Sequence, residues 1–155
     1  MDLNKLGTND WLIGGGWVVF LVGGIFNWFS WDFGDDVFGI DVVDVSASGF
    51  DASWRFWVPL LFGLATALVA IIPKLSPNLN LPELPISWGQ LTAGLGVATG
   101  VFAVLGFLAK PSGSSWSFGI FISLVGAAGV VVGAILELRE IETASREGQQ
   151  PPQPF

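Results

Sequence analysis

The chain has 155 residues, of which 52% are hydrophobic and 12% are charged, and its net charge at pH 7 is −7. Because soluble domains carry roughly twice this share of charge, the composition indicates a protein embedded in a lipid bilayer. The absence of cysteine and histidine excludes disulfides, thiolate or imidazole metal sites, haem ligation and Ser-His-Asp triads. The negative net charge and only six basic residues exclude a nucleic-acid partner.

Uncharged runs predict four membrane spans, at about 11–31, 56–72, 86–109 and 116–136, with the last helix extending to about 147. As a helix the first run would cover roughly 31 Å, about the hydrocarbon thickness of a bilayer. It ends in the bulky sequence "NWFSW" with no small-residue cleavage site, so we expect a retained helix and not a signal peptide. The predicted fold is therefore an all-α bundle of four transmembrane helices over residues 1–148, followed by a disordered tail rich in Pro and Gln at 149–155.

The basic residues beside the spans predict the orientation, because cytoplasmic flanks are enriched in lysine and arginine. With a cytoplasmic amino terminus, four basic residues lie inside and two outside, namely Lys5, Lys74, Arg139 and Arg146 against Arg55 and Lys110. An even number of spans then places both termini in the cytoplasm of a multi-pass plasma-membrane protein.

Tryptophan residues gather where the predicted spans end. Indole rings favour the headgroup depth of a bilayer, because they are part apolar and part hydrogen-bonding. We therefore expect interface anchors at the inner boundary (Trp11 and Trp88) and at the outer boundary (Trp28, Trp31, Trp54, Trp57 and Trp116).

Small residues at four-residue spacing predict the contacts between helices, since they let helix backbones approach closely. Two GxxxG pairs and a shorter stripe carry this pattern: Gly96 and Gly100, Gly129 and Gly133, and Gly119 with Ser123. Two interpretations stay open. These residues either close the bundle itself, or form a homo-oligomer or receive the helix of a membrane-protein partner.

The predicted outer loop, between the first two spans, is strongly acidic. Its sequence "FGIDVVDVSAS" favours a short strand or a small β-hairpin. Calcium takes six to eight oxygen ligands, which the carboxylates of this loop could supply, but their spacing fits no EF-hand. The weak calcium candidates are therefore five aspartates: Asp32, Asp35, Asp36, Asp41 and Asp44. The alternative is a solvated acidic surface, and the string "DFG" in this loop has no accompanying kinase motif.

Four short motifs stand beside the spans: "TNDWLIGGG", "IIPK", "AKPSG" and "ILELRE". With these motifs, the layout of nearly the whole chain resembles a group of small four-span actinobacterial membrane proteins that includes mycobacterial antigen-type members. The tail is much shorter than in those members and the outer loop more acidic. The resemblance implies a four-span fold and no catalytic residue.

The predicted spans contain no ionisable side chain, which argues against a pump or a proton-coupled carrier. We therefore expect a non-enzymatic accessory or scaffold protein of a cell-envelope or membrane complex, without a cofactor. The alternative is a small-solute channel or facilitator with an acidic outer vestibule. An enzyme that uses aspartate pairs of the outer loop is a third and weaker hypothesis.

Overall fold

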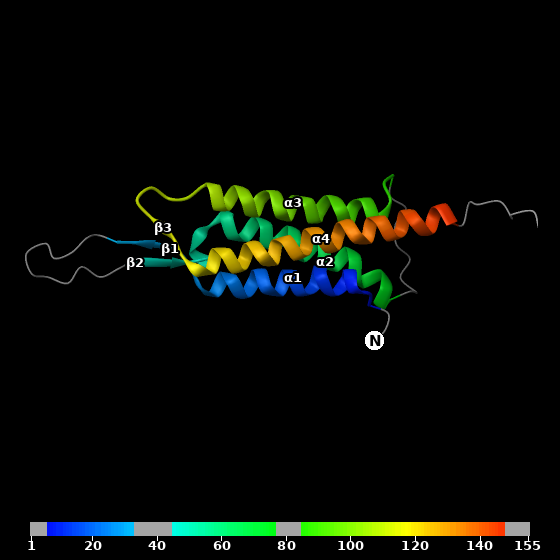
Figure 1. The fold of residues 1–155 in the computed structure, drawn as a ribbon, viewed down its shortest axis with the longest axis horizontal. Helices are drawn as coiled ribbons and strands as arrows, with labels where there is room; N and C mark the ends of the chain where they lie inside the picture. Colours follow the sequence, from blue (N-terminus) through cyan, green and yellow to red (C-terminus); the bar gives the residue numbers. More distant parts are fainter. Residues whose placement is uncertain (1–5, 33–44, 77–84, 148–155) are drawn as a thin grey trace, which may run out of the picture.

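The computed structural model describes residues 6–32, 45–76 and 85–147. In chain order the elements are α1 (Thr8–Ile25), β1 (Asn27–Trp31), β2 (Val45–Ser48), the 3-10 helix η2 (Phe50–Ala52), α2 (Trp54–Leu75), α3 (Trp88–Leu108), β3 (Ser115–Trp116) and α4 (Phe118–Glu147). Four long helices lie side by side, and the strands lie beyond one end of them, here called the sheet end (Figure 1). A mostly helical fold with a small β element, as predicted, is confirmed in this coarse form.

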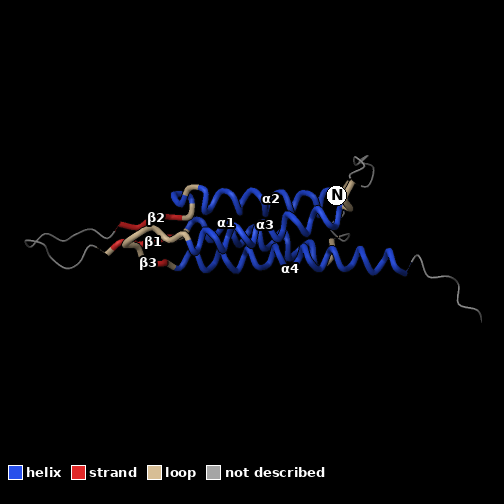
Figure 2. Tube along the Cα trace, turned by 90° about the horizontal axis from the view of Figure 1, so that it is seen from above, coloured by secondary structure: helices blue, strands red, loops and turns tan. Residues whose placement is uncertain are grey.

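Three of the helices are long and apolar enough to cross a membrane: α2, α3 and α4. The helix α1 is shorter and carries Asp10 in its first turn. It packs along α4, and α2 and α3 pack on one another. Viewed from above, α4 continues past the other helices at the end opposite the strands (Figure 2).

The prediction of one continuous span over residues 11–31 is wrong at its carboxyl end. The helix ends at Ile25, Phe26 is extended (φ −82°, ψ 161°) and the chain continues as strand β1. This strand lies between β2 and β3 in an antiparallel sheet of order β2-β1-β3. The strand expected in the acidic loop is thus present at Val45–Ser48, and residues 33–44 lie outside the described part.

Two of the last carbonyls of α1 are bonded by residues that follow the helix, which explains how the helix can end at Ile25. The indole Nε1 of Trp28 donates a hydrogen bond to the Gly23 carbonyl at 3.1 Å. The backbone N–H of Gly49 donates to the Gly24 carbonyl at 2.9 Å. Helix ends leave four carbonyls without an intrahelical partner, so these two bonds stabilise the transition from helix to strand.

Trp28 itself corrects a prediction, because it is not an interface anchor. Only 2% of its surface is exposed, and its ring packs edge-on against Phe56 with centroids 5.5 Å apart. Phe20 stacks on the same Phe56 ring at 5.5 Å. Non-local aromatic packing thus places this indole in the core, since α1 and α2 both contribute to its pocket.

The other predicted anchors are placed differently. Trp11, Trp54, Trp57 and Trp116 are exposed, and Trp31 and Trp88 are half-buried. Trp11 and Trp88 belong to the first turns of α1 and α3. Trp31 and Trp116 lie on strands β1 and β3, and Trp54 and Trp57 lie in the first turn of α2, which begins at the sheet end.

Candidate functional site

Three charged side chains meet at the end of the helices opposite the sheet. The Lys74 Nζ lies 2.8 Å from Oδ1 of Asp10 and 2.8 Å from Oε1 of Glu137. Asp10 belongs to the first turn of α1, Lys74 to the last turn of α2, and Glu137 to α4. One ammonium group therefore ties three helices together, and we call these three residues the charged cluster.

The charged cluster is largely withdrawn from solvent. Asp10 is 1% exposed and Glu137 is 6% exposed, and 30% of the Lys74 side chain is accessible. Two carboxylates face one ammonium group, so the fully ionised cluster carries one net negative charge. Burial makes an uncompensated charge costly, and the integrity of this end of the molecule thus depends on all three partners.

Two of the charged residues lie at the helix ends that stabilise their charges. A helix amino terminus favours a negative group and a carboxyl terminus a positive one, which suits Asp10 on α1 and Lys74 on α2. The Oδ2 atom of Asp10 also accepts a hydrogen bond from the backbone N–H of Gly7 at 2.9 Å. Asp10 thereby accepts a hydrogen bond from the backbone of the N-cap residue of α1 in addition to its ion pair with the lysine.

Sequence reasoning missed this cluster because each residue lies just outside a predicted span. Asp10 precedes the run at 11–31, Lys74 follows the run at 56–72, and Glu137 follows the run at 116–136. A signal was nevertheless present. All three flank the same predicted membrane face, and packed helices bring such flanks together, so the opposite charges at these span ends indicated an ion pair.

The predicted small-residue pairs face the chain's own helices. A methyl group at Gly100 would lie 2.6 Å from Cγ2 of Val131 on α4, and one at Gly96 would collide with Ala134 of the same helix. On α4, methyl groups at Gly129 and Gly133 would lie 3.2 Å from Gly16 Cα and 2.7 Å from Ile13 Cγ1 of α1.

The shorter stripe on α4 also faces α1. A methyl group at Gly119 would lie 2.7 Å from the Gly23 carbonyl oxygen, and the Ser123 hydroxyl donates to the Phe20 carbonyl at 3.1 Å. These contacts favour the interpretation that the small residues close the helical group itself.

Polar side chains between the helices are bonded within the protein. The hydroxyls of Thr66, Thr92 and Thr99 each donate to the carbonyl four residues earlier on their own helix, at 2.8–3.0 Å. Within the described ranges no buried side-chain nitrogen or oxygen lacks a partner. These groups are thus already engaged in stabilising the helices.

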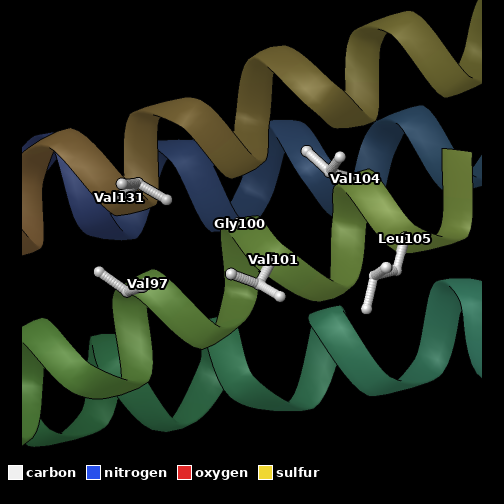
Figure 3. A pocket seen from close by; sticks show the side chains of 6 residues that line it. All are labelled: Val97, Gly100, Val101, Val104, Leu105 and Val131. Carbon is white, nitrogen blue, oxygen red and sulfur yellow. The ribbon is translucent and has the colours of Figure 1, made fainter. Parts of the chain in front are cut away.

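An apolar depression of about 370 Å³ opens outward along α3 and α4. Its lining is aliphatic, with Val97, Val101, Val104 and Leu105 from α3 and Val131 from α4 around Gly100 (Figure 3). A second depression of about 290 Å³ adjoins it and shares Gly100, Val104 and Val131. We call the two together the α3–α4 groove.

The predicted calcium candidates fall mostly outside the described residues. Asp35, Asp36, Asp41 and Asp44 lie in 33–44, and Asp32 is exposed at the end of the sheet. Among the residues that the structure describes, no group of three or more His, Cys, Asp or Glu could hold a metal ion. Asp51 accepts hydrogen bonds from the backbone N–H and hydroxyl of Ser48, at 3.1 and 2.7 Å, so it acts as a turn residue.

Comparison with protein-family models, with curated proteins and with solved structures finds no match for this chain. The resemblance to small actinobacterial membrane proteins therefore stays a prediction.

Proposed function

We propose that the chain is a four-span protein of the plasma membrane that acts as a non-enzymatic accessory or scaffold subunit of a membrane complex. In this proposal α1 crosses the membrane in addition to α2, α3 and α4. Both termini are then cytoplasmic, and the sheet end faces outward. The actinobacterial four-span group remains the family with which we would compare it.

Membrane insertion of α1 is supported by the side chains that it turns away from its neighbours. Val18, Val22 and Ile25 are 49%, 41% and 64% exposed. The inward side of α1 carries glycines that pack against α4. Apolar residues outside with small residues between helices are typical of helices that pack in lipid, where backbone proximity and not hydrophobic burial drives association.

A scaffold role is carried by one observation, the charged cluster that ties α1, α2 and α4. Its ionisable groups are paired with each other and are thus engaged in holding helices rather than offered to a substrate. The interior hydroxyls are likewise bonded to backbone carbonyls. Such a body presents mainly apolar outward faces, which favours contact with partner helices over conduction of a polar solute.

Photo-crosslinking in native membranes tests the proposal. A photoreactive amino acid would replace, one at a time, exposed residues on three helices: Val18, Leu68 and Val125. We expect one face to yield a discrete protein adduct and the others to yield lipid. Ile13, which is fully buried, serves as the control position and should give only crosslinks within the chain. The absence of a protein adduct at every one of the exposed positions would contradict the scaffold role.

A further inference from the structure

About one helical turn beyond the α3–α4 groove, toward the sheet end, both helices contribute to a group of aromatic rings that carries a cation. Phe107 of α3 stacks on Trp116 of β3 with ring centroids 4.9 Å apart. Phe107 also packs against Phe121 of α4 at 6.1 Å, and the Lys110 Nζ lies over the Trp116 ring at 4.9 Å from its centroid. The same two helices that form the groove therefore lead to a lysine at the sheet end.

Lys110 has donor capacity left at this position. Its amino group donates to the Ser114 carbonyl, whereas an ammonium group carries three donors. Both ion pairs of the described ranges involve Lys74, so in that part of the chain Lys110 neutralises no carboxylate. The side chain is exposed and can bind an anion at the membrane surface.

The spacing between groove and lysine suits an amphiphile. Val104 lines both depressions. From Val104 to the last residue of α3, Leu108, the helix rises roughly 6 Å, and Lys110 follows two residues after the helix end. An anionic group at Lys110 would thus stand at the interface while a hydrocarbon chain reaches past the aromatic rings into the groove. The ring of Trp116 beside Lys110 is amphipathic, and such rings favour the interface between membrane and water.

We infer that the α3–α4 groove binds the acyl chain of an anionic phospholipid whose phosphate pairs with Lys110. The inference goes beyond the scaffold role and requires only that α3 and α4 lie in the membrane. Lipid is the occupant because a basic residue lies beyond the sheet-end of the same α3–α4 seam that forms the aliphatic groove, an arrangement that complements an acidic headgroup and its chain.

Native mass spectrometry of the full chain in detergent tests the inference. The probes are phosphatidylglycerol and phosphatidylcholine with identical acyl chains, added separately to the unchanged protein. We expect a preference for phosphatidylglycerol of about fivefold in apparent affinity, the factor that one lysine contributes at an anionic surface. Equal binding of the two lipids would overturn the inference.

Three variants locate the site. Lys110→Gln should make the two lipids bind equally, whereas Val104→Trp, which fills the groove from its exposed side, should weaken both. The matched control is Arg139→Gln, which removes an exposed cation from α4 at the opposite end and should change nothing. A preference that survives Lys110→Gln, or that disappears in Arg139→Gln, would contradict the assignment.

A photoreactive residue at Val104 separates this inference from the scaffold proposal. We expect a lipid adduct at this position. A protein adduct there would overturn the lipid assignment and leave the scaffold role standing. Lipid adducts at Val104, together with no protein adduct at any other exposed position, would support the lipid assignment and contradict the scaffold role.

Discussion

The Lys74 amino group lies 2.8 Å from a carboxylate oxygen of Asp10, a residue 64 positions earlier in the chain. The same amino group contacts Glu137, so it is the common partner of two buried acids. This relationship holds one end of the helical group together, and two predictions about stability depend on it.

Lys74→Met should strongly destabilise the protein, because it leaves two buried carboxylates facing each other without a counterion. We expect the free energy of unfolding in detergent to fall by about 2–4 kcal/mol, below the upper values for buried pairs because 30% of the lysine side chain is exposed. Unfolding by a denaturing detergent measures the loss. Arg139→Gln is the control, and an equal loss there would show that the effect is not specific to the cluster.

Neutralising the whole cluster should cost less than removing the lysine alone. In a variant that combines Asp10→Asn, Lys74→Met and Glu137→Gln, no charge is left buried, and the asparagine can still accept the hydrogen bond of the Gly7 N–H. Replacing a buried ionic group completely is often close to neutral. The same unfolding measurement should give a stability nearer to the unchanged chain than to Lys74→Met. A triple variant less stable than the single one would contradict this account.

The contact between α1 and α4 should tolerate no side chain at Gly126. A methyl group there would lie 2.6 Å from the Gly16 carbonyl oxygen and 2.8 Å from Phe20 Cα, both backbone atoms that cannot turn aside. We expect Gly126→Ala to lower the free energy of unfolding by about 1–3 kcal/mol.

Gly15→Ala is the matched control, since a methyl group at Gly15 meets nothing within 4 Å. Alanine favours the helix over glycine by up to about 1 kcal/mol, so this variant should be neutral or more stable. If both alanine variants behaved alike in the unfolding measurement, the close approach of α1 and α4 would be refuted.

Trp28→Phe tests how α1 ends. The substitution keeps an aromatic ring among Phe20 and Phe56 but removes the donor that bonds the Gly23 carbonyl. Loss of this buried hydrogen bond and of part of the indole volume should cost about 1–3 kcal/mol. Trp54→Phe, at an exposed indole, should leave stability and the near-ultraviolet circular dichroism nearly unchanged. A Trp28→Phe protein as stable as the Trp54→Phe control would contradict the role given to this indole.

Much of the helical layout is readable from hydropathy, because long uncharged runs have few alternatives in lipid. The runs predicted at 56–72, 86–109 and 116–136 correspond to α2, α3 and α4, and their ends differ from the predictions by a few residues except where α4 continues to Glu147. That continuation was expected from the charged helical pattern after residue 136. Local sequence therefore predicts where these helices lie.

Contacts between distant segments could not be predicted in the same way. The segment from Asn27 to Trp31 is uncharged and rich in aromatic residues, so the uncharged run includes it in the first span, whereas pairing with Val45–Ser48 and Ser115–Trp116 makes it a strand. Trp28 resembles an interface anchor in sequence, yet rings from α1 and α2 enclose it. The charged cluster follows the same rule, because only the packed helices bring Asp10, Lys74 and Glu137 together.

The central claim is that α1 crosses the membrane together with the three longer helices. The chain contains no cysteine, so single cysteines can be introduced without background and labelled by a membrane-impermeant thiol reagent. Suitable exposed positions are Thr8 and Ser145, both at the end of the helical group opposite the sheet, and Ser46 and Ser112 at the sheet end.

The four-span account predicts that Ser46→Cys and Ser112→Cys react in intact cells, and that Thr8→Cys and Ser145→Cys react only after permeabilisation. Reaction of Thr8→Cys in intact cells together with Ser46→Cys, while Ser145→Cys stays protected, would mean three spans and would contradict the account.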